Sequence, residues 1–367
     1  MSQSLVSERV YNFSAGPAVL PEEVLERIRD EMMCLPGAGS SILEISHRSK
    51  PFDAILEGAD QRLRQLLSIS DDYSVLFLQG GSRLQFSMIP MNISTAERPG
   101  DYLVTGSWSQ KAAAEAARLS GGRVIFDGKP DNFCRVPESS EFENNSDRSF
   151  LYYAANETIQ GVQFQDLPDG NDLVSDLSSE FLSRPFDVDR HAAIYACAQK
   201  NAGPAGLTVV IIRKSLLEQV PDNLPAYLNF REHDSNGSRF NTPPTFAIYV
   251  TDLVLQWILD KFGSLESMQA HNESKAALLY DVIDEFPEFY IGHSRVESRS
   301  RMNVTFRFAD EAIGDQFKSE AAEHQMQSLG GHRSVGGIRA SIYNAMPVAG
   351  VQTLADFMRD FAKKHAS

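Results

Sequence analysis

The stretch that decides the fold is Tyr195-Ala196-Cys197-Ala198-Gln199-Lys200-Asn201, an apolar run that contains a lysine, Lys200. A second apolar run, residues 172–176, ends in Asp176, 24 residues before Lys200. Burial disfavours the ammonium form of lysine, so an amine at the end of a buried strand can attack an aldehyde. The position of Lys200 is therefore that expected of a lysine that forms a Schiff base.

Asp176 complements such a lysine. A carboxylate on a neighbouring strand keeps a pyridine nitrogen protonated, which lets the ring draw electrons from a carbanion. Lys200 and Asp176 together therefore suggest pyridoxal phosphate as a cofactor. In the alternative interpretation, Lys200 reaches from a strand end into solvent and Asp176 caps the next element. Other residues must decide between the two.

Short apolar runs resembling those around Lys200 and Asp176 recur along the first two thirds of the chain. They cover residues 74–79, 102–106, 123–127, 149–155, 172–176, 192–197 and 207–213. Continuous apolarity predicts strands that are buried on both faces, and helix-length spacers such as 110–119 predict a mostly parallel sheet covered by helices. Ligands of such α/β sheets bind at the carboxyl ends of the strands.

Length and local pattern indicate two domains in this chain of 367 residues, with a single-domain barrel as the alternative from length alone. An amphipathic helix is expected at 21–33, and an apolar-faced helix at 245–261 is followed by Phe262-Gly263-Ser264, where a second domain is expected to begin. That domain is expected to be α+β. Its predicted elements are helices at 265–285 and 356–364 and strands around 304–308 and 338–342.

Charge and cysteine content exclude several classes of protein. The formal net charge of −15 argues against a nucleic-acid or anionic-membrane partner, which would need a basic face. Cys34, Cys134 and Cys197 are odd in number and form no CxxC, so neither a disulfide framework nor a metal site is expected. No apolar stretch approaches the roughly 18 residues of a membrane span, and residues 1–10 lack a signal-peptide core. A cytoplasmic protein is expected.

A glycine turn follows the first predicted strand of the sheet. Gly80-Gly81-Ser82-Arg83 lies between the strand ending at Gln79 and a helix expected from Leu84. Glycines let the backbone approach an anion, and the free N–H groups of the helix start face it, so the turn predicts a phosphate cradle. The alternative is an ordinary turn. The motif lacks the GxGxxG and GxxxxGK[ST] patterns of dinucleotide and nucleoside triphosphate sites.

Two further residues follow predicted strands in the same way. Trp108 comes just after the strand at 102–106, where an indole could stack on a flat cofactor ring, although a tryptophan of the core is the alternative. Thr158, in Asn156-Glu157-Thr158, follows the strand at 149–155 and offers a hydroxyl to a phenolate oxygen, unless the segment is a simple turn. These positions favour one ligand site at the carboxyl edge of the sheet.

Cationic residues form clusters despite the acidic total. The clusters are Ser46-His47-Arg48, Arg299-Ser300-Arg301, and His332-Arg333 with Arg339. Arginine binds carboxylate or phosphate in a bidentate manner, so such clusters in loops indicate a local pocket for anions. Surface ion pairs are the alternative for each cluster.

Motifs along nearly the whole chain resemble the phosphoserine aminotransferase family, in the family's order. They are Asn12-Phe13-Ser14-Ala15-Gly16-Pro17, Ser46-His47-Arg48, Gly80 to Phe86, Asn156-Glu157-Thr158, Ala198 to Gly206, Phe240 to Thr245, Arg301 to Val304, and Gly331-His332-Arg333 through Arg339 to Asn344. One departure is Leu177, which replaces the family's usual aromatic residue while Asp176 is kept.

This resemblance implies an α/β enzyme of fold type I that uses pyridoxal 5′-phosphate. The large domain would be residues 16–262, with a mostly parallel seven-stranded sheet between helices, and residues 1–15 and 263–367 would form a small α+β domain. The family transfers the amino group of L-glutamate to 3-phosphohydroxypyruvate, giving O-phospho-L-serine and 2-oxoglutarate in serine biosynthesis. It forms homodimers with shared active sites. Action on a phosphorylated oxo acid of pyridoxine biosynthesis, known for some members, is left open.

The resemblance also implies a role for each site residue. Lys200 would bind the cofactor covalently and then move a proton at the substrate α-carbon, and Asp176 would pair with the pyridine nitrogen. The other cofactor-binding residues would be Ser82, Arg83, Trp108, Thr158 and Gln199, with Asn241 and Thr242 from the partner subunit. The residues that would bind substrate are His47, Arg48, His332, Arg333 and Arg339.

Two rival functions fit parts of the pattern. A cysteine desulfurase would keep the cofactor but needs an exposed nucleophilic cysteine on a loop, whereas Cys197 lies within a predicted buried strand. A non-catalytic protein that binds phosphorylated metabolites would use the histidine and arginine clusters without a lysine-linked chromophore. Formation of glutamate from phosphoserine and 2-oxoglutarate would separate the aminotransferase from both.

Overall fold

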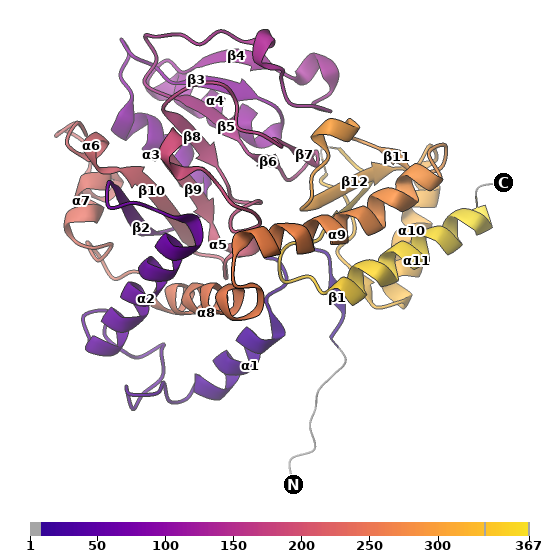
Figure 1. The fold of residues 1–367 in the computed structure, drawn as a ribbon, viewed down its shortest axis with the longest axis horizontal. Coiled ribbons are helices and arrows are strands. Elements are labelled where there is room, and N and C mark those ends of the chain that lie inside the picture. Colours follow the sequence, from indigo (N-terminus) through magenta and orange to yellow (C-terminus); the bar gives the residue numbers. More distant parts are fainter. Residues whose placement is uncertain (1–8, 334, 366–367) are drawn as a thin grey trace.

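A seven-stranded sheet forms the centre of the computed structural model, which describes residues 9–333 and 335–365 (Figure 1). Its strand order is β2-β10-β9-β8-β5-β3-β4. The strands are β2 (Tyr73–Gln79), β3 (Asp101–Val104), β4 (Arg123–Asp127), β5 (Leu151–Ala154), β8 (Leu173–Asp176), β9 (His191–Cys197) and β10 (Leu207–Arg213). β10 is antiparallel to both neighbours, and the other six strands run in one direction. The predicted α/β fold with a mostly parallel sheet is confirmed.

Burial explains why the apolar runs are strands. All seven residues of β9 are buried, and so are all four residues of β3, β5 and β8. β4, at the edge of the sheet, is only partly buried. The run that contains Lys200 does not stay extended, however: β9 ends at Cys197, and Lys200 lies in the short helix α5 (Ala198–Asn201). Lys200 is therefore presented by a turn of helix rather than by a strand end.

Helices cover both faces of the sheet. One face packs against α1 (Glu22–Glu31), α2 (Lys50–Leu67) and α8 (Thr245–Phe262), and the other against α3 (Arg83–Ile93) and α4 (Ser107–Leu119). The short helices α6 (Lys214–Leu217) and α7 (Phe230–Ser235) lie near β10 and β2. Several of these helices match the predicted ranges, but α2, which buries Phe52, Ala59 and Leu63, was not predicted.

The last hundred residues build a second core. It contains α9 (Leu265–Glu285), α10 (Glu311–Glu323), α11 (Val348–His365) and a sheet of β11 (Ile291–Gly292), β12 (Asn303–Arg307) and β14 (Ile338–Ser341). α9 agrees with the predicted helix, whereas α11 begins eight residues before the predicted start and α10 was not predicted. Phe13 packs in this core, and β1 (Tyr11–Asn12) pairs with β13 (Met326–Gln327). The domain boundaries at 15 and 262 stay a prediction.

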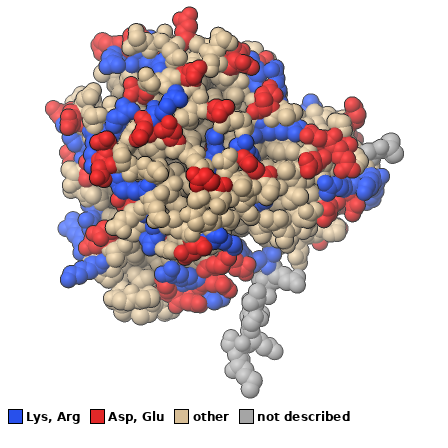
Figure 2. Space-filling view, viewed as in Figure 1, with Lys and Arg blue, Asp and Glu red and all other residues tan. Residues whose placement is uncertain are grey.

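Surface charge is mixed rather than segregated on the face shown in Figure 2, where Lys and Arg alternate with Asp and Glu. No helix of the described residues is long and apolar enough to cross a membrane.

A small hairpin, β6 (Asn156–Glu157) and β7 (Val162–Gln163), follows β5 at the carboxyl edge of the sheet and carries the chain past Thr158. The residues predicted from strand ends therefore lie at the same edge.

Candidate active site

Lys200 projects from α5 toward the loop between β6 and β7. Its Nζ donates a hydrogen bond to the Thr158 hydroxyl at 2.6 Å. The Lys200 side chain is half-buried, because its amine opens into a cavity instead of being enclosed by the core. An amine in this setting has both a hydroxyl partner and space for a reactant.

The cavity has a volume of about 540 Å³ and lies at the carboxyl edge of the sheet. The predicted site residues that line it are Ser82, Arg83, Trp108, Thr158, Asp176, Gln199, Lys200, His332 and Arg339. They come from segments up to 257 residues apart, from Ser82 to Arg339. Ala15 and Gly16 complete the wall from the beginning of the chain. The fold therefore gathers most of the predicted residues around one space.

Asp176 ends β8 and faces this cavity. Its Oδ1 accepts a hydrogen bond from the backbone N–H of Ser178 at 2.8 Å. Burial raises the pKa of the Asp176 carboxyl, while the Lys200 ammonium and the Ser178 N–H favour its charged form. A buried carboxyl with a raised pKa next to a cation is suited to sharing a proton with a basic ring nitrogen.

The segment around Gly80 and Gly81 has the predicted arrangement of a strand, a glycine turn and a helix. Gly80 has φ of +104°, which favours glycine, and α3 begins at Arg83. A Cβ atom at Gly81 would meet no other atom within 4 Å, so the backbone of the turn is open on that side. The Ser82 hydroxyl lies 2.5 Å from the Ser178 hydroxyl and accepts from the Cys197 N–H at 3.1 Å. The start of α3 thus presents free N–H groups to an anion.

Trp108 lies in the first turn of α4 and is held there by Glu157, which was not among the predicted site residues. The carboxylate of Glu157 accepts from the N–H groups of Trp108 and Ser109 at 2.9 and 2.8 Å, and from the Ser109 hydroxyl at 2.6 Å. Burial raises the pKa of Glu157, and these hydrogen bonds oppose that shift. A Cβ at Gly106 would lie 2.4 Å from Glu157 Cδ, so only glycine admits this carboxylate. The Asn156-Glu157-Thr158 motif was the available signal.

Cations surround the Trp108 indole. Nζ of Lys111 lies 4.5 Å from the ring centroid, Nζ of Lys200 5.4 Å and Cζ of Arg83 5.8 Å. Lys111 was not predicted, although its place one turn after Trp108 on α4 follows from helical spacing. Three cations around one ring indicate a site that receives anionic ligands.

Arg339 adds a further positive charge at the cavity, and His332 lies near it. Burial lowers the pKa of the Arg339 guanidinium, which stays charged at neutral pH. Burial and the neighbouring Arg339 lower the pKa of His332 below its usual value of 6.5. At neutral pH His332 is therefore a neutral hydrogen-bonding group beside a charged one.

Three polar atoms at the cavity are buried and have no hydrogen-bond partner among the described residues. They are Nε1 of Trp108, Oε1 of Gln199 and Nε of Arg339. Buried polar groups are normally satisfied, so a cluster of unsatisfied ones around a cavity indicates a bound polar molecule. A flat, anionic cofactor fits the donors, the acceptor and the open glycine turn.

A family model described as aminotransferase class-V matches residues 10–354 of this chain. The chain belongs to the class-V aminotransferase family. It is 52% identical over 363 residues to the phosphoserine aminotransferase of Rhodopirellula baltica, an alignment that covers 98% of this chain and 96% of that protein.

Solved structures agree with this class-V aminotransferase assignment. The phosphoserine aminotransferase of Bacillus circulans subsp. alkalophilus is 44% identical with a TM-score of 0.95, covering 98% of this chain and 99% of that one. The PLP-bound phosphoserine aminotransferase of Trichomonas vaginalis is 41% identical with a TM-score of 0.91, covering 96% and 100%. The predicted family is therefore confirmed.

Five predicted residues of this class-V aminotransferase do not line the cavity: His47, Arg48, Asn241, Thr242 and Arg333. Asn241 donates to Oε1 of Gln79 at 2.9 Å, and Gln79 donates to the Thr242 carbonyl at 3.1 Å, which places both next to the end of β2. His47 and Arg48 lie just before α2. Their assigned roles stay predictions.

The cluster of Arg299 and Arg301 follows the alternative interpretation. Arg299 forms an ion pair with Asp284 at 2.5 Å, and Arg301 with Glu273 at 3.3 Å. Both carboxylates belong to α9. These arginines therefore attach the segment before β12 to the helix instead of lining the cavity.

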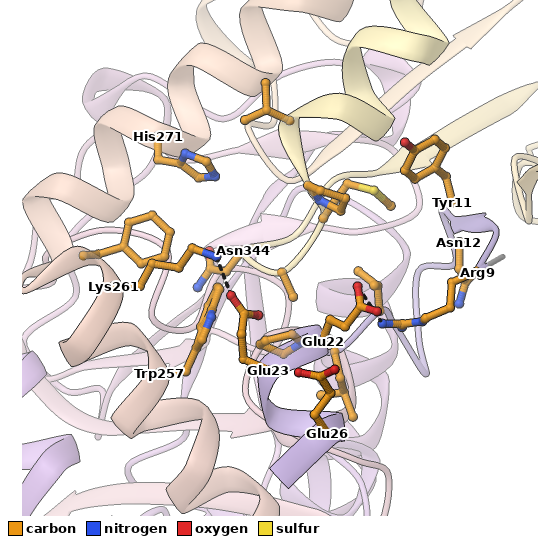
Figure 3. Close-up of a pocket in the computed structure, with 18 of the residues that line it drawn as sticks. Arg9, Tyr11, Asn12, Glu22, Glu23, Glu26, Trp257, Lys261, His271 and Asn344 are labelled. Carbon is orange, nitrogen blue, oxygen red and sulfur yellow. Dashed lines mark hydrogen bonds and ion pairs between the residues drawn. The ribbon is translucent and has the colours of Figure 1, made fainter. Parts of the chain in front are cut away.

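A second cavity of about 590 Å³ lies between α1, the end of α8, α9 and the start of α11 (Figure 3). Figure 3 shows an ion pair between Lys261 and Glu23, at 2.7 Å, and one between Arg9 and Glu22, at 3.8 Å. None of the predicted site residues lines this cavity. It is larger than the cavity at Lys200 but has no nucleophile paired with a buried carboxyl, so size alone does not locate the chemistry.

Proposed function

We propose that this class-V aminotransferase is a phosphoserine aminotransferase. It transfers the amino group of L-glutamate to 3-phosphohydroxypyruvate and so forms O-phospho-L-serine and 2-oxoglutarate, a step of L-serine biosynthesis. The observation that carries the proposal is the convergence of Lys200, Asp176 and the Gly80 to Arg83 turn on one cavity with cationic walls. The relatives that bear this name match the chain over nearly its whole length.

The cavity residues fit pyridoxal phosphate. When bound, this cofactor supplies an aldehyde for an amine and a ring that withdraws electrons from the substrate α-carbon. Ser82, Arg83 and the N–H groups at the start of α3 would hold its phosphate, together with the Gln199 side chain. Trp108 would stack on its ring, and the Thr158 hydroxyl would bind its phenolate oxygen.

Lys200 and Asp176 are the catalytic residues in this proposal. Nζ of Lys200 moves the proton at the substrate α-carbon, because it is the amine that projects into the cavity and the Thr158 hydroxyl orients it. Asp176 holds the proton of the ring nitrogen. The Ser178 N–H fixes Oδ1 of Asp176 in place, which leaves Oδ2 for the nitrogen.

Substrate recognition depends on the cationic side of the cavity. Arg339 would bind the α-carboxylate that every substrate of the reaction shares, since a guanidinium binds a carboxylate in a bidentate manner. His332, with Arg333, His47 and Arg48, would receive either the phosphate of phosphoserine or the distal carboxylate of glutamate. Both tails are anions, so one cationic pocket serves the two half-reactions.

A homodimer with shared active sites accounts for the residues outside the cavity. Met33 is 85% exposed and Leu43 is 63% exposed, both on the segment that leads to His47, and a partner subunit would cover such apolar side chains. His47, Arg48, Asn241 and Thr242 would then reach the cavity of the second subunit. The free state of Cys34, Cys134 and Cys197 supports a reducing, cytoplasmic location.

The function is tested with purified protein, pyridoxal phosphate, phosphoserine and 2-oxoglutarate. Formation of glutamate is expected, and it would not occur with a cysteine desulfurase or with a protein that only binds anions. Cys197 is 3% exposed and cannot present a thiol on a loop, which disfavours the desulfurase. A protein that binds the cofactor but forms no glutamate would refute the assignment.

Shared sites are tested by mixing two impaired variants, Lys200→Ala and Arg48→Ala, under conditions that exchange subunits. If Arg48 serves the partner's cavity, half of the sites in each hybrid dimer have both residues intact, and activity reappears on mixing. If each cavity uses its own Arg48, the mixture is no more active than the sum of its parents. Light scattering of the unmixed protein gives the mass of the assembly.

A further inference from the structure

Lys275 is a buried lysine that the proposed reaction does not use. It lies on α9 and is fully enclosed, with 0% of its surface exposed. Its Nζ donates to the backbone carbonyls of Tyr343 at 2.7 Å, Ile342 at 3.1 Å and Met346 at 3.3 Å, and the Asn344 carbonyl lies at 3.5 Å. None of the described carboxylates forms an ion pair with it.

Such a site is costly. An ammonium loses its hydration on burial, and here only backbone carbonyls replace the water. Burial lowers the pKa of Lys275 to about 7, which reflects this cost. The carbonyls around Nζ all belong to residues 342–346, so the backbone of this loop is the feature that Lys275 holds in place.

The carbonyls of the loop point toward Lys275. The Asn344 N–H and the Tyr343 hydroxyl of the same loop contact residues near Lys200. The Asn344 N–H donates to Oδ1 of Asn201 at 2.9 Å, and Asn201 is the residue after Lys200 in α5. The Tyr343 hydroxyl donates to the Ala15 carbonyl at 2.9 Å. Ala15 and Gly16 line the cavity, and a Cβ at Gly16 would lie 3.5 Å from Cγ of Lys200.

The loop also contacts the segment that follows Asp176. Nδ2 of Asn344 donates to the Leu182 carbonyl at 2.8 Å, and Nδ2 of Asn201 donates to the Phe181 carbonyl at 2.7 Å. Asn272, one turn before Lys275 on α9, donates to Oδ1 of Asn344 at 2.8 Å. One face of α9 therefore holds the loop, and the loop joins three segments that border the cavity.

We propose that Lys275 is a positioning residue for Lys200, acting through the 342–346 loop, Asn344 and Asn201. This role depends on the proposed function in one respect, namely that Lys200 is the reactive amine. Lys275 touches neither substrate nor cofactor. It holds the backbone of α5 and of Ala15 in place, and this fixes the direction in which the Lys200 side chain points into the cavity.

Lys275→Met in the full chain tests the proposal, because methionine fills similar space and donates no hydrogen bond. In the enzyme with bound cofactor, kcat is expected to fall about 10- to 100-fold, because displacement of a reacting group by about 1 Å has an effect of this size. KM for both substrates should stay nearly unchanged. In the cofactor-free chain, the rate at which an acylating reagent labels Lys200 is expected to change severalfold. Labelling of the exposed Lys214 serves as internal reference.

Tyr290→Phe is the matched control. The Tyr290 hydroxyl is buried in the same core, but it donates to the Met358 carbonyl at 2.7 Å and not to the 342–346 loop. It should lower thermal stability while leaving Lys200 labelling and kcat as in the wild type. If Lys275→Met behaves like this control, Lys275 is only structural and the proposal is overturned.

Lys275→Gln keeps the proposal testable if Lys275→Met does not fold. Its amide can donate to two of the carbonyls, so Lys200 labelling and kcat are expected to lie between those of the wild type and complete loss. Wild-type values for both in a destabilised Lys275→Gln protein would count against the role. If the wild type shows no turnover, only the phosphoserine assignment is refuted. The role of Lys275 can still be tested, because the comparison of Lys200 labelling between wild type and variants needs no substrate.

Discussion

The two ends of β9 bury titratable groups in opposite ways. At the amino end, His191 is fully buried, and its ring nitrogens lie 2.7 Å from the Asp187 carbonyl and 2.9 Å from the Tyr153 hydroxyl. The Tyr73 hydroxyl donates to the His191 carbonyl at 2.8 Å. Each of these polar atoms has a partner, so this end of the strand needs no ligand.

At the carboxyl end, the polar groups surround a space. Nζ of Lys200 donates to the Thr158 hydroxyl, and nearby Trp108, Gln199 and Arg339 each have a buried polar atom without a partner among the described residues. Burial alone therefore does not distinguish a structural group from a reactive one. Unsatisfied hydrogen-bonding capacity around a cavity does.

The largest expected effect is at the reactive end. Lys200→Ala should lower turnover by several orders of magnitude, since a positioned general base alone contributes about 10²- to 10⁴-fold. The free energy of unfolding should change little, because the side chain opens into the cavity. Steady-state kinetics and denaturant titration measure the two quantities. Residual activity within tenfold of the wild type would remove Lys200 from its role.

Asp176→Asn should have the next largest effect. The amide keeps the shape and can still accept from the Ser178 N–H, but it cannot hold the proton of a pyridine nitrogen. Loss of one charged partner in a buried pair costs about 3 kcal/mol, which corresponds to about 10²-fold in kcat. Single-turnover kinetics with phosphoserine measures this. A kcat equal to that of the wild type would place the electron sink elsewhere.

Arg339→Ala should act mainly on substrate binding. A charged hydrogen bond contributes about 1.5–3 kcal/mol, so KM for both glutamate and phosphoserine should rise about 10- to 100-fold. The rise should be similar for the two substrates, because they share the α-carboxylate. A change confined to one substrate would assign Arg339 to the variable tail instead.

The amino end should respond to pH and not to substrate. Burial lowers the pKa of His191 to about 4 from its usual 6.5, so the unfolded chain binds more protons between these values and stability falls as pH decreases through that window. The contribution is about 3 kcal/mol when complete. His191→Gln should remove this part of the pH dependence, measured by denaturant titration at pH 7, 6 and 5, with kcat at pH 7 unchanged. An altered kcat would link the two ends of β9.

The strands of the sheet and most residues of the cavity could be predicted from the sequence. The seven strands follow from apolar runs, and Lys200, Asp176, Trp108 and Thr158 follow from what comes after each run, because parallel strands end at one edge of a sheet. Helix α2 was missed although its sequence carried the signal, since Phe52, Ala59, Leu63 and Leu67 recur at helical spacing.

Residues whose role depends on distant contacts could not be found in this way. Glu157 matters because it meets the start of α4, 48 residues earlier in the chain, and Lys275 because it meets carbonyls almost 70 residues later. Neither contact has a local pattern. His47 and Asn241 lie outside the cavity of their own chain, so the roles assigned to them come from the family resemblance alone.

The wall that Ala15 and Gly16 share with Arg339 has a consequence for protein synthesis. A ribosome adds Arg339 long after Ala15, so this wall of the pocket cannot close until the chain has been synthesised as far as residue 339. The central sheet can assemble before then, since its last strand ends at Arg213. A chain terminated after the central sheet would therefore lack His332 and Arg339 from its pocket.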